Sequence, residues 1–243
     1  MRNITDPNSD ALIHMLVLVR DFFRMKIIVF DLDGTLINSA PDLHAAAVKM
    51  LQDFSKPELA LEQVISFIGN GVPTLVRRCL EAADAEEVDY DAALESFREH
   101  YLAAPVALSR PYEGVLELLN TLASNHFKLA VCTNKSEKMT SEVLKGLDLD
   151  YFFDAVIGGD TLPVRKPSPD PLRLAFSRIG AENCVGELYV GDSEVDAETA
   201  EAVGCDFALF SNGYRKKPID QLRRHFVFDD FKRLAEFIIG RIS

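Results

Sequence analysis

Short apolar runs that alternate with helix-like stretches constrain the fold of this chain more than any other feature. The runs are rich in Val, Ile and Phe, are bounded by turn residues, and lie at 26–30, 128–132, 155–158, 187–190 and 206–210. Helix-like stretches, including 136–147, 169–179 and 195–203, separate the later runs. Strands and helices that alternate at this spacing predict parallel pairing. We therefore expect an α/β protein with a Rossmann-like parallel sheet that helices cover on both faces.

The long interval between the first run and the second predicts an inserted domain. It spans nearly a hundred residues, which is more than one crossover helix can fill. Apolar residues at three- and four-residue spacing predict helices at 40–53, 58–67, 72–83 and 88–103. Ser39 precedes the first of them as a candidate N-cap, with Pro41 in its first turn. We expect a helical cap domain at 40–105, a core domain at 25–39 and 106–243, and an N-terminal extension of unknown role at 1–24.

The charge balance argues against nucleic-acid and membrane partners. Thirty-eight acidic and 26 basic residues give a formal net charge of -12. The apolar run at 11–19 is too short to span a bilayer, which takes about 20 residues, and it lacks the flanks of a signal peptide. The four cysteines include no CxxC pair and predict neither a zinc site nor a disulfide framework. We expect a soluble cytoplasmic protein, monomeric or homodimeric, that acts on a small molecule.

Side chains capable of chemistry follow several of the predicted strands. The segments are Asp31-Leu32-Asp33-Gly34-Thr35, Thr133-Asn134-Lys135, Arg165-Lys166-Pro167 and Gly191-Asp192-Ser193-Glu194-Val195-Asp196. Each one alone is more typical of a solvated turn, a helix cap or a surface lysine than of an active site. In a parallel sheet, however, ligands bind beyond the carboxyl ends of the strands. The order and common location of the segments therefore favour one active site.

These four segments resemble, in order, the motifs of haloacid dehalogenase superfamily phosphatases. The matching stretches are DLDGTL at 31–36, TN at 133–134, KP at 166–167 and GDSEVD at 191–196. The resemblance covers the chain from about Met25 to its C-terminus. It implies a hydrolase that cleaves a small phosphate monoester with the help of Mg²⁺. Such esters react slowly because their anionic oxygens repel a carboxylate nucleophile, so the site must neutralise charge and fix the geometry.

The resemblance also implies separate roles for the two carboxylates of the first motif. Asp31 would attack phosphorus and become an aspartyl-phosphate, which divides the displacement into two easier steps. Asp33 would protonate the leaving alkoxide and then activate water for the second step. Their spacing of two suits this division, because residues i and i+2 leave an extended segment on the same side. Gly34 allows the sharp turn that follows.

Mg²⁺ is the implied cofactor, and it prefers oxygen ligands. The resemblance assigns it the Asp31 side chain, the Asp33 backbone carbonyl and the Asp192 side chain. Asp196, one helical turn beyond Asp192, would support the metal from the outer shell, through water. Thr133, the Asn134 backbone and Lys166 would hold the phosphoryl oxygens.

Segments within and around the insert narrow the resemblance to bacterial phosphoglycolate phosphatases. They are Asn38-Ser39-Ala40-Pro41-Asp42-Leu43, Ile68-Gly69-Asn70-Gly71, Arg110-Pro111-Tyr112-Glu113-Gly114-Val115 and Lys166-Pro167-Ser168-Pro169-Asp170-Pro171-Leu172. The resemblance implies that Gly69, Asn70 and Gly71 form a substrate-specificity loop. Arg78 would then pair with the glycolate carboxylate, a task that suits a guanidinium group. Without the resemblance, this stretch reads as a helix C-cap and a surface arginine.

Departures from the family pattern leave alternatives open. Asn38 stands where the relatives usually have Asp, and Ser168 where many have His. A phosphatase for another small sugar phosphate, or a phosphosugar mutase, would share the core motifs. The sequence DGT at 33–35, in place of the mutases' DGV or DGI, counts against a mutase. A regulatory protein that binds metal without catalysis is the alternative from another class, although no motif residue is missing.

Overall fold

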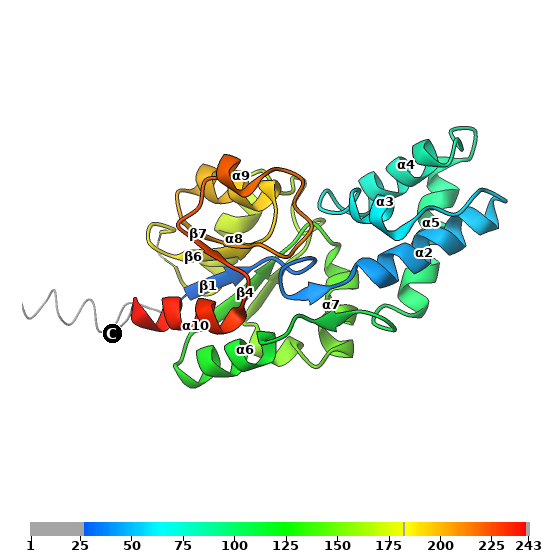
Figure 1. Cartoon of the computed structure of the whole chain (residues 1–243). Coiled ribbons are helices and arrows are strands. Elements are labelled where there is room, and N and C mark those ends of the chain that lie inside the picture. Colours follow the sequence, from blue (N-terminus) through cyan, green and yellow to red (C-terminus); the bar gives the residue numbers. More distant parts are fainter. Residues whose placement is uncertain (1–26, 182, 242–243) are drawn as a thin grey trace, which may run out of the picture.

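The expected parallel sheet forms the centre of the larger lobe in the computed structural model, which describes residues 27–181 and 183–241 (Figure 1). Its strands lie in the order β5-β4-β1-β6-β7-β8, and each neighbouring pair is parallel. Their bounds are β1 Ile27–Phe30, β4 Lys128–Cys132, β5 Ala155–Ile157, β6 Leu188–Gly191, β7 Asp206–Phe210 and β8 Phe226–Phe228. The predicted α/β fold class is confirmed. The predicted extension at 1–24 lies outside the described residues.

Alternation along the strands divides the core into two apolar layers. In β1, Ile28 and Phe30 face one layer, and Ile27 and Val29 face the other. Three helices cover the first layer: α6 (Val115–Ser124), α7 (Glu137–Gly146) and α10 (Phe231–Gly240). Two helices cover the second: α8 (Asp170–Arg178) and α9 (Glu194–Val203). Both faces of the sheet are therefore buried, as parallel strands require.

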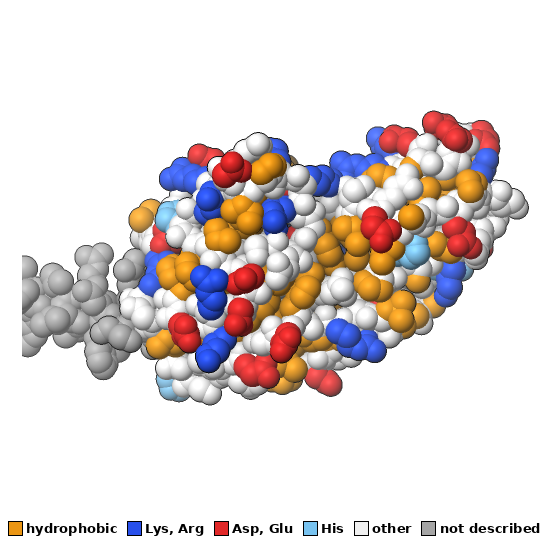
Figure 2. All heavy atoms as spheres, in the orientation of Figure 1, with side chains coloured by type: hydrophobic (Ala, Val, Ile, Leu, Met, Phe, Trp, Pro, Cys, Tyr) orange, Lys and Arg blue, Asp and Glu red, His pale blue; other side chains and the backbone are white. Residues whose placement is uncertain are grey.

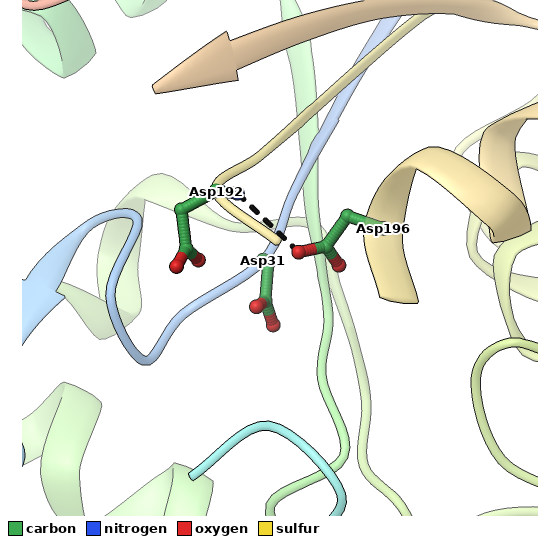
Figure 3. Close-up of side chains that lie close together, drawn as sticks. All are labelled: Asp31, Asp192 and Asp196. Atoms are coloured by element: carbon green, nitrogen blue, oxygen red, sulfur yellow. Dashed lines mark hydrogen bonds between the residues drawn. The ribbon is translucent and has the colours of Figure 1, made fainter. Parts of the chain in front are cut away.

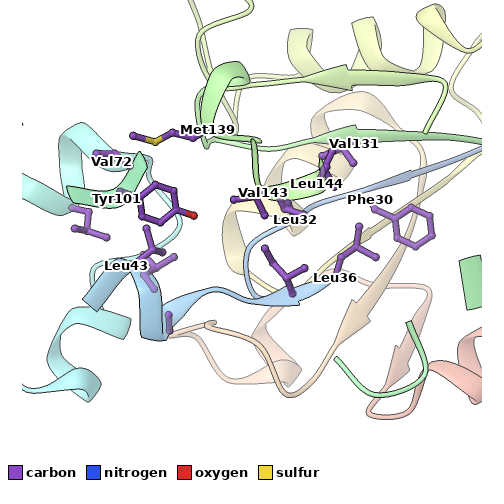
Figure 4. Packing of buried hydrophobic residues seen from close by; sticks show 14 of the residues in the cluster. Phe30, Leu32, Leu36, Leu43, Val72, Tyr101, Val131, Met139, Val143 and Leu144 are labelled. Atoms are coloured by element: carbon purple, nitrogen blue, oxygen red, sulfur yellow. The ribbon is translucent and has the colours of Figure 1, made fainter. Parts of the chain in front are cut away.

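The inserted helices form a smaller lobe beyond one end of the sheet (Figure 1). They are α2 (Ala40–Asp53), α3 (Leu61–Ile65), α4 (Val72–Ala82) and α5 (Tyr90–Ala103). The chain enters and leaves this lobe through a short antiparallel pair, β2 (Ile37–Asn38) and β3 (Arg110–Pro111). One apolar cluster continues from the core into the lobe (Figure 4). We propose this lobe as the cap domain, with the predicted boundaries of 40–105.

Local details of the inserted lobe differ from the expectations. Ser39 takes the N-cap position of α2, but its side chain accepts no bond from the helix, because Ser39 has helical backbone angles (φ -95°, ψ -7°). The Tyr214 hydroxyl accepts the Ala40 N–H instead, at 3.0 Å. The segment predicted as a helix at 58–67 is helical only over α3. Among the described helices, none combines the length and apolar character needed to cross a bilayer.

Candidate active site

The predicted core residues meet at the carboxyl ends of β1, β4 and β6. One cavity is lined by Asp31, Asp33, Leu43, Ile68, Gly69, Gly71, Val72, Leu75, Thr133, Asn134, Lys135, Lys166, Ser193, Val195 and Asp196. A second hollow shares several of these residues and adds Asn70, Asp192, Glu194, Tyr214 and Lys216. The structure therefore brings together all the predicted site residues except Arg78, which lines neither hollow.

Asp31 follows β1 directly and is buried beside a lysine. Lys166 Nζ lies 2.9 Å from Asp31 Oδ1. Burial raises the pKa of Asp31 from 3.8 to about 7, and the nearby Asp196 adds to the increase, while Lys166 opposes it. Without a further cation, the site therefore holds the Asp31 carboxylate in an unfavourable state at neutral pH.

Asp192 follows β6 and is held by the first motif and a distant loop. Thr35 Oγ1 donates to Asp192 Oδ1 at 2.8 Å, and the Tyr214 N–H donates to Oδ2 at 2.6 Å. Gly34 permits this approach, because a Cβ there would lie 2.7 Å from Asp192 Oδ2 and the residue has a φ of +84°. Burial, and then the charges of Asp196 and Asp31, raise the pKa of Asp192 well above its usual value.

Asp196 organises the lysine and the start of α9. Its Oδ1 accepts from Lys166 Nζ at 2.7 Å and from the Tyr189 hydroxyl at 2.6 Å. Its Oδ2 accepts from the Ser193 hydroxyl at 2.6 Å, and Ser193 in turn caps the helix in a capping box. Burial disfavours the ionised carboxylate, but the charge of Lys166 and the hydrogen bonds from Lys166, Ser193 and Tyr189 together outweigh burial, so the pKa of Asp196 is lowered.

The three buried carboxylates fit a divalent cation. Asp31, Asp192 and Asp196 each offer an oxygen, and these oxygens lie within 4.8 Å of one another (Figure 3). Each carboxylate oxygen of Asp196 already accepts at least two hydrogen bonds, whereas each oxygen of Asp192 accepts one. Asp31 and Asp192 therefore have the greater capacity to bind Mg²⁺, which favours oxygen ligands. Burial first, and then repulsion between the carboxylates, raises the pKa of both groups, and a bound cation would favour their ionised forms.

Lys135 is a charged residue of the cavity to which the sequence analysis gave no role. Its side chain is 1% exposed, and its Nζ lies 3.0 and 3.1 Å from the two carboxylate oxygens of Asp33. The same ammonium lies 4.7 Å from the ring centroid of Tyr101, which belongs to α5 of the inserted lobe. The sequence signal that could have identified Lys135 as a site residue was its position directly after Thr133-Asn134. A lysine at a strand end is usually solvated, and nothing in the sequence pairs it with Asp33 or Tyr101.

Asn134 joins the core to the predicted specificity loop. Its side-chain Nδ2 donates to the backbone carbonyls of Gly69 and Lys166, each at 3.0 Å. Thr133, next to it, is buried, and its N–H donates to the Ile157 carbonyl at 3.0 Å. Neither residue caps α7, because the Ser136 side chain fills that role. The polar groups of Thr133 and Asn134 are therefore held at the cavity by the β4–α7 connection.

Arg78 is bonded to the start of the predicted specificity loop. Its Nη1 donates to the backbone carbonyl of Phe67 at 3.0 Å, and the side chain is half-buried. The contact attaches the guanidinium group to the residue just before Ile68-Gly69-Asn70-Gly71. The predicted pairing of Arg78 with a substrate carboxylate stays a prediction.

Comparison with known proteins places the chain in a family. The haloacid dehalogenase-like hydrolase family model matches residues 28–210. A phosphoglycolate phosphatase of Cereibacter sphaeroides is 44% identical over 217 residues, which are 88% of this chain and 98% of that protein. A phosphoglycolate phosphatase of Rhodospirillum rubrum is 39% identical over 219 residues, covering 88% of this chain and 90% of the relative.

Solved structures agree with this assignment. A crystal structure described as a predicted phosphoglycolate phosphatase from Haemophilus somnus is 32% identical, with a TM-score of 0.81 over 88% of this chain and 97% of that one. A crystal structure described as a putative phosphoglycolate phosphatase from Lactobacillus delbrueckii is 26% identical, with a TM-score of 0.76. The chain belongs to the haloacid dehalogenase-like hydrolases.

Proposed function

We propose that this protein is a Mg²⁺-dependent phosphatase that converts 2-phosphoglycolate to glycolate and phosphate. The buried Asp31–Lys166 pair is the observation that carries the proposal, because it sets a carboxylate nucleophile beside a cation that can receive phosphoryl oxygens. Asp33 lines the same cavity, where a proton donor is needed. The relatives named phosphoglycolate phosphatase support the choice of substrate.

The reaction follows from these positions in two displacements. An Asp31 carboxylate oxygen attacks phosphorus, the bond from phosphorus to the glycolate oxygen breaks, and Asp33 donates a proton to that oxygen. Water then attacks the phosphorus of the aspartyl-phosphate while Asp33 accepts its proton. The bond between phosphorus and Asp31 breaks, which releases phosphate and restores the Asp31 carboxylate and the protonated Asp33. Lys166, with Thr133 and the Asn134 backbone, holds the phosphoryl oxygens throughout.

The charges of the two hollows support a role for Mg²⁺. Asp31, Asp33, Asp192 and Asp196 line them, opposed mainly by Lys135 and Lys166. Most of these groups are buried, so their repulsion toward an anionic ester is poorly screened. Bound at Asp31, Asp192 and the Asp33 carbonyl, with Asp196 behind, Mg²⁺ would neutralise the phosphoryl charge and orient the ester.

The inserted lobe supports a small leaving group. Leu43, Ile68, Val72 and Leu75 close one side of the cavity with apolar side chains. Asn134 and the Gly69 carbonyl join this wall to the core. Such closure excludes water from the reacting groups and limits the length of the substrate.

A substrate panel tests the proposal. Phosphate release is measured for 2-phosphoglycolate and several neutral sugar phosphates, with Mg²⁺ and with EDTA, using Asp31→Asn as the inactive control. We expect phosphate release to be fastest from 2-phosphoglycolate and to require Mg²⁺. Equal phosphate release by wild type and Asp31→Asn would contradict the proposal that the protein hydrolyses phosphate esters through Asp31. An isomerised sugar phosphate without free phosphate would instead identify a mutase.

A further inference from the structure

Two buried lysines line the cavity, and they are used differently. Lys166 Nζ contacts Asp31 at 2.9 Å and Asp196 at 2.7 Å, so two carboxylates already surround it. Lys135 has a single described carboxylate partner, Asp33, at 3.0 and 3.1 Å. The Lys135 side chain is 1% exposed, so its ion pair with Asp33 lies inside the cavity. The cavity thus holds a fixed cation beyond the one that serves the nucleophile.

The position of Lys135 matches the far end of a two-carbon substrate. Asp33 is the proposed proton donor to the oxygen that links phosphorus to glycolate. In 2-phosphoglycolate, one methylene group separates that oxygen from the carboxylate. When Asp33 reaches the linking oxygen, an ammonium about one hydrogen bond away from Asp33 lies within reach of the substrate carboxylate.

The inserted lobe contacts Lys135 through an aromatic ring. The ring of Tyr101 lies against the ammonium at 4.7 Å and is itself 1% exposed. Figure 4 shows Tyr101 between Leu43 and Val72 on one side and Val143 and Leu32 on the other. A buried ammonium with one carboxylate partner gains from a second anion, because desolvation is already complete.

Resting on the proposed function, we propose that Lys135 determines specificity by binding the carboxylate of a short phosphorylated hydroxy acid. Binding at Lys135 frees Asp33 to contact the linking oxygen. Arg78 has a different task, since its guanidinium bonds the Phe67 carbonyl and lines neither hollow. Specificity for the carboxylate therefore comes from the core, at the residue that follows the Thr133-Asn134 motif.

A matched pair of esters isolates this role. 2-Hydroxyethyl phosphate has the same leaving oxygen and length as 2-phosphoglycolate but ends in a neutral hydroxyl. kcat and KM are measured for both esters with wild type, Lys135→Met, Lys135→Arg and Arg78→Met. We expect wild type to favour 2-phosphoglycolate by on the order of 100-fold in kcat/KM, a size typical of a buried charge pair. Lys135→Met should reduce the preference to a few-fold, mainly through the KM for 2-phosphoglycolate. Lys135→Arg should recover part of it, and Arg78→Met should keep most of it.

If Lys135→Met lowers kcat/KM equally for both esters, the proposal is overturned, because Lys135 would then act only through Asp33. Loss of the preference in Arg78→Met but not in Lys135→Met would overturn it as well. Lys135→Gln keeps a polar group at the buried position and replaces Lys135→Met if the latter does not fold.

Calorimetric binding of both esters to Asp31→Asn, with and without Lys135→Met, separates this inference from the proposed function. Absence of turnover by wild type on both esters would contradict the phosphatase alone. A binding preference for 2-phosphoglycolate that disappears with Lys135 would still support the inference, and a preference that persists would refute it.

Discussion

The core and the inserted lobe supply different kinds of atoms to the same cavity. The core supplies buried carboxylates and ammonium groups, and Lys166 and Asp196 each have several partners. Residues 40–105, all of which are described, line the cavity with apolar side chains and with the loop at 68–71, and no charged side chain of theirs lines it. Figure 2 shows apolar side chains on the visible surface where the two lobes meet. The difference indicates that charge and chemistry belong to the core, while the lobe sets size and excludes water.

The largest expected effect comes from removing a core charge. Lys166→Met should lower kcat for 2-phosphoglycolate by on the order of 1,000-fold, because Asp31 and the phosphoryl oxygens lose their cation. Lys145→Met, on an exposed position of α7, is the matched control and should leave kcat unchanged. Steady-state phosphate release checks both variants. A loss below tenfold in Lys166→Met would show that the core cation is dispensable.

A second test measures the free energy of unfolding, because burial of the ionised Asp31 carboxylate destabilises the folded state. Burial raises the pKa of Asp31 from 3.8 to about 7, so the folded state keeps a proton that the unfolded state releases. Metal-free wild type should therefore lose stability as pH rises from about 4 to about 7, by at most about 4 kcal/mol from this group. Asp31→Asn should lack this loss and be the more stable protein at pH 7.5.

Urea unfolding in EDTA at pH 4.5 and pH 7.5 measures this difference, with the exposed Asp220→Asn as control. Added Mg²⁺ should raise the stability of wild type at pH 7.5 and affect Asp31→Asn less, because ligands that bind only the folded state stabilise it. If the free energies of unfolding of wild type and Asp31→Asn change in parallel across this pH range, the claim that ionised Asp31 destabilises the folded state is refuted.

A smaller effect is expected where the lobe meets the core. Gly71 has a φ of +84°, and a Cβ there would lie 2.8 Å from Arg165 Nη1 and 3.0 Å from the Asn134 carbonyl oxygen. Gly69 has a φ of +110°, but a Cβ there would meet nothing within 4 Å. Both alanine variants strain the loop, whereas only Gly71→Ala pushes it from the core. We expect kcat/KM to fall about tenfold more in Gly71→Ala, equivalent to about 1.4 kcal/mol. Equal values for the two variants would mean that loop contact with the core is unimportant.

The same division between core and lobe explains what the sequence could predict. The core motifs lie at strand ends, and parallel strands bring their ends together, so Asp31, Thr133, Lys166 and Asp192 could be placed in one site. The strand β8 was not predicted, and α6 and α10 were not singled out. These elements complete the sheet and its cover without changing the site.

Side-chain contacts around the cavity, within each lobe and between them, could not be predicted. The pairing of Lys135 with Asp33 and Tyr101 joins three segments that no periodicity connects. Tyr189 is a strand residue whose apolar ring predicts core packing, yet its hydroxyl also accepts from Lys166 and donates to Asp196. Arg78 follows the loop at a helical spacing, but its direction depends on a bond to the Phe67 carbonyl. The directions in which these side chains point depend on tertiary packing, and the spacing of motifs in the sequence does not specify that packing.

The most direct test of the central claim is the covalent state of Asp31 during turnover. The wild-type enzyme is mixed with excess 2-phosphoglycolate and Mg²⁺, quenched with acid within the first turnovers, and analysed by peptide mass spectrometry. We predict one phosphoryl group on the peptide that contains Asp31, placed on Asp31 by fragmentation and absent from Asp31→Asn. Rapid phosphate release without this adduct in the same quenched samples, or an adduct on another residue, would contradict Asp31 as the nucleophile of the core.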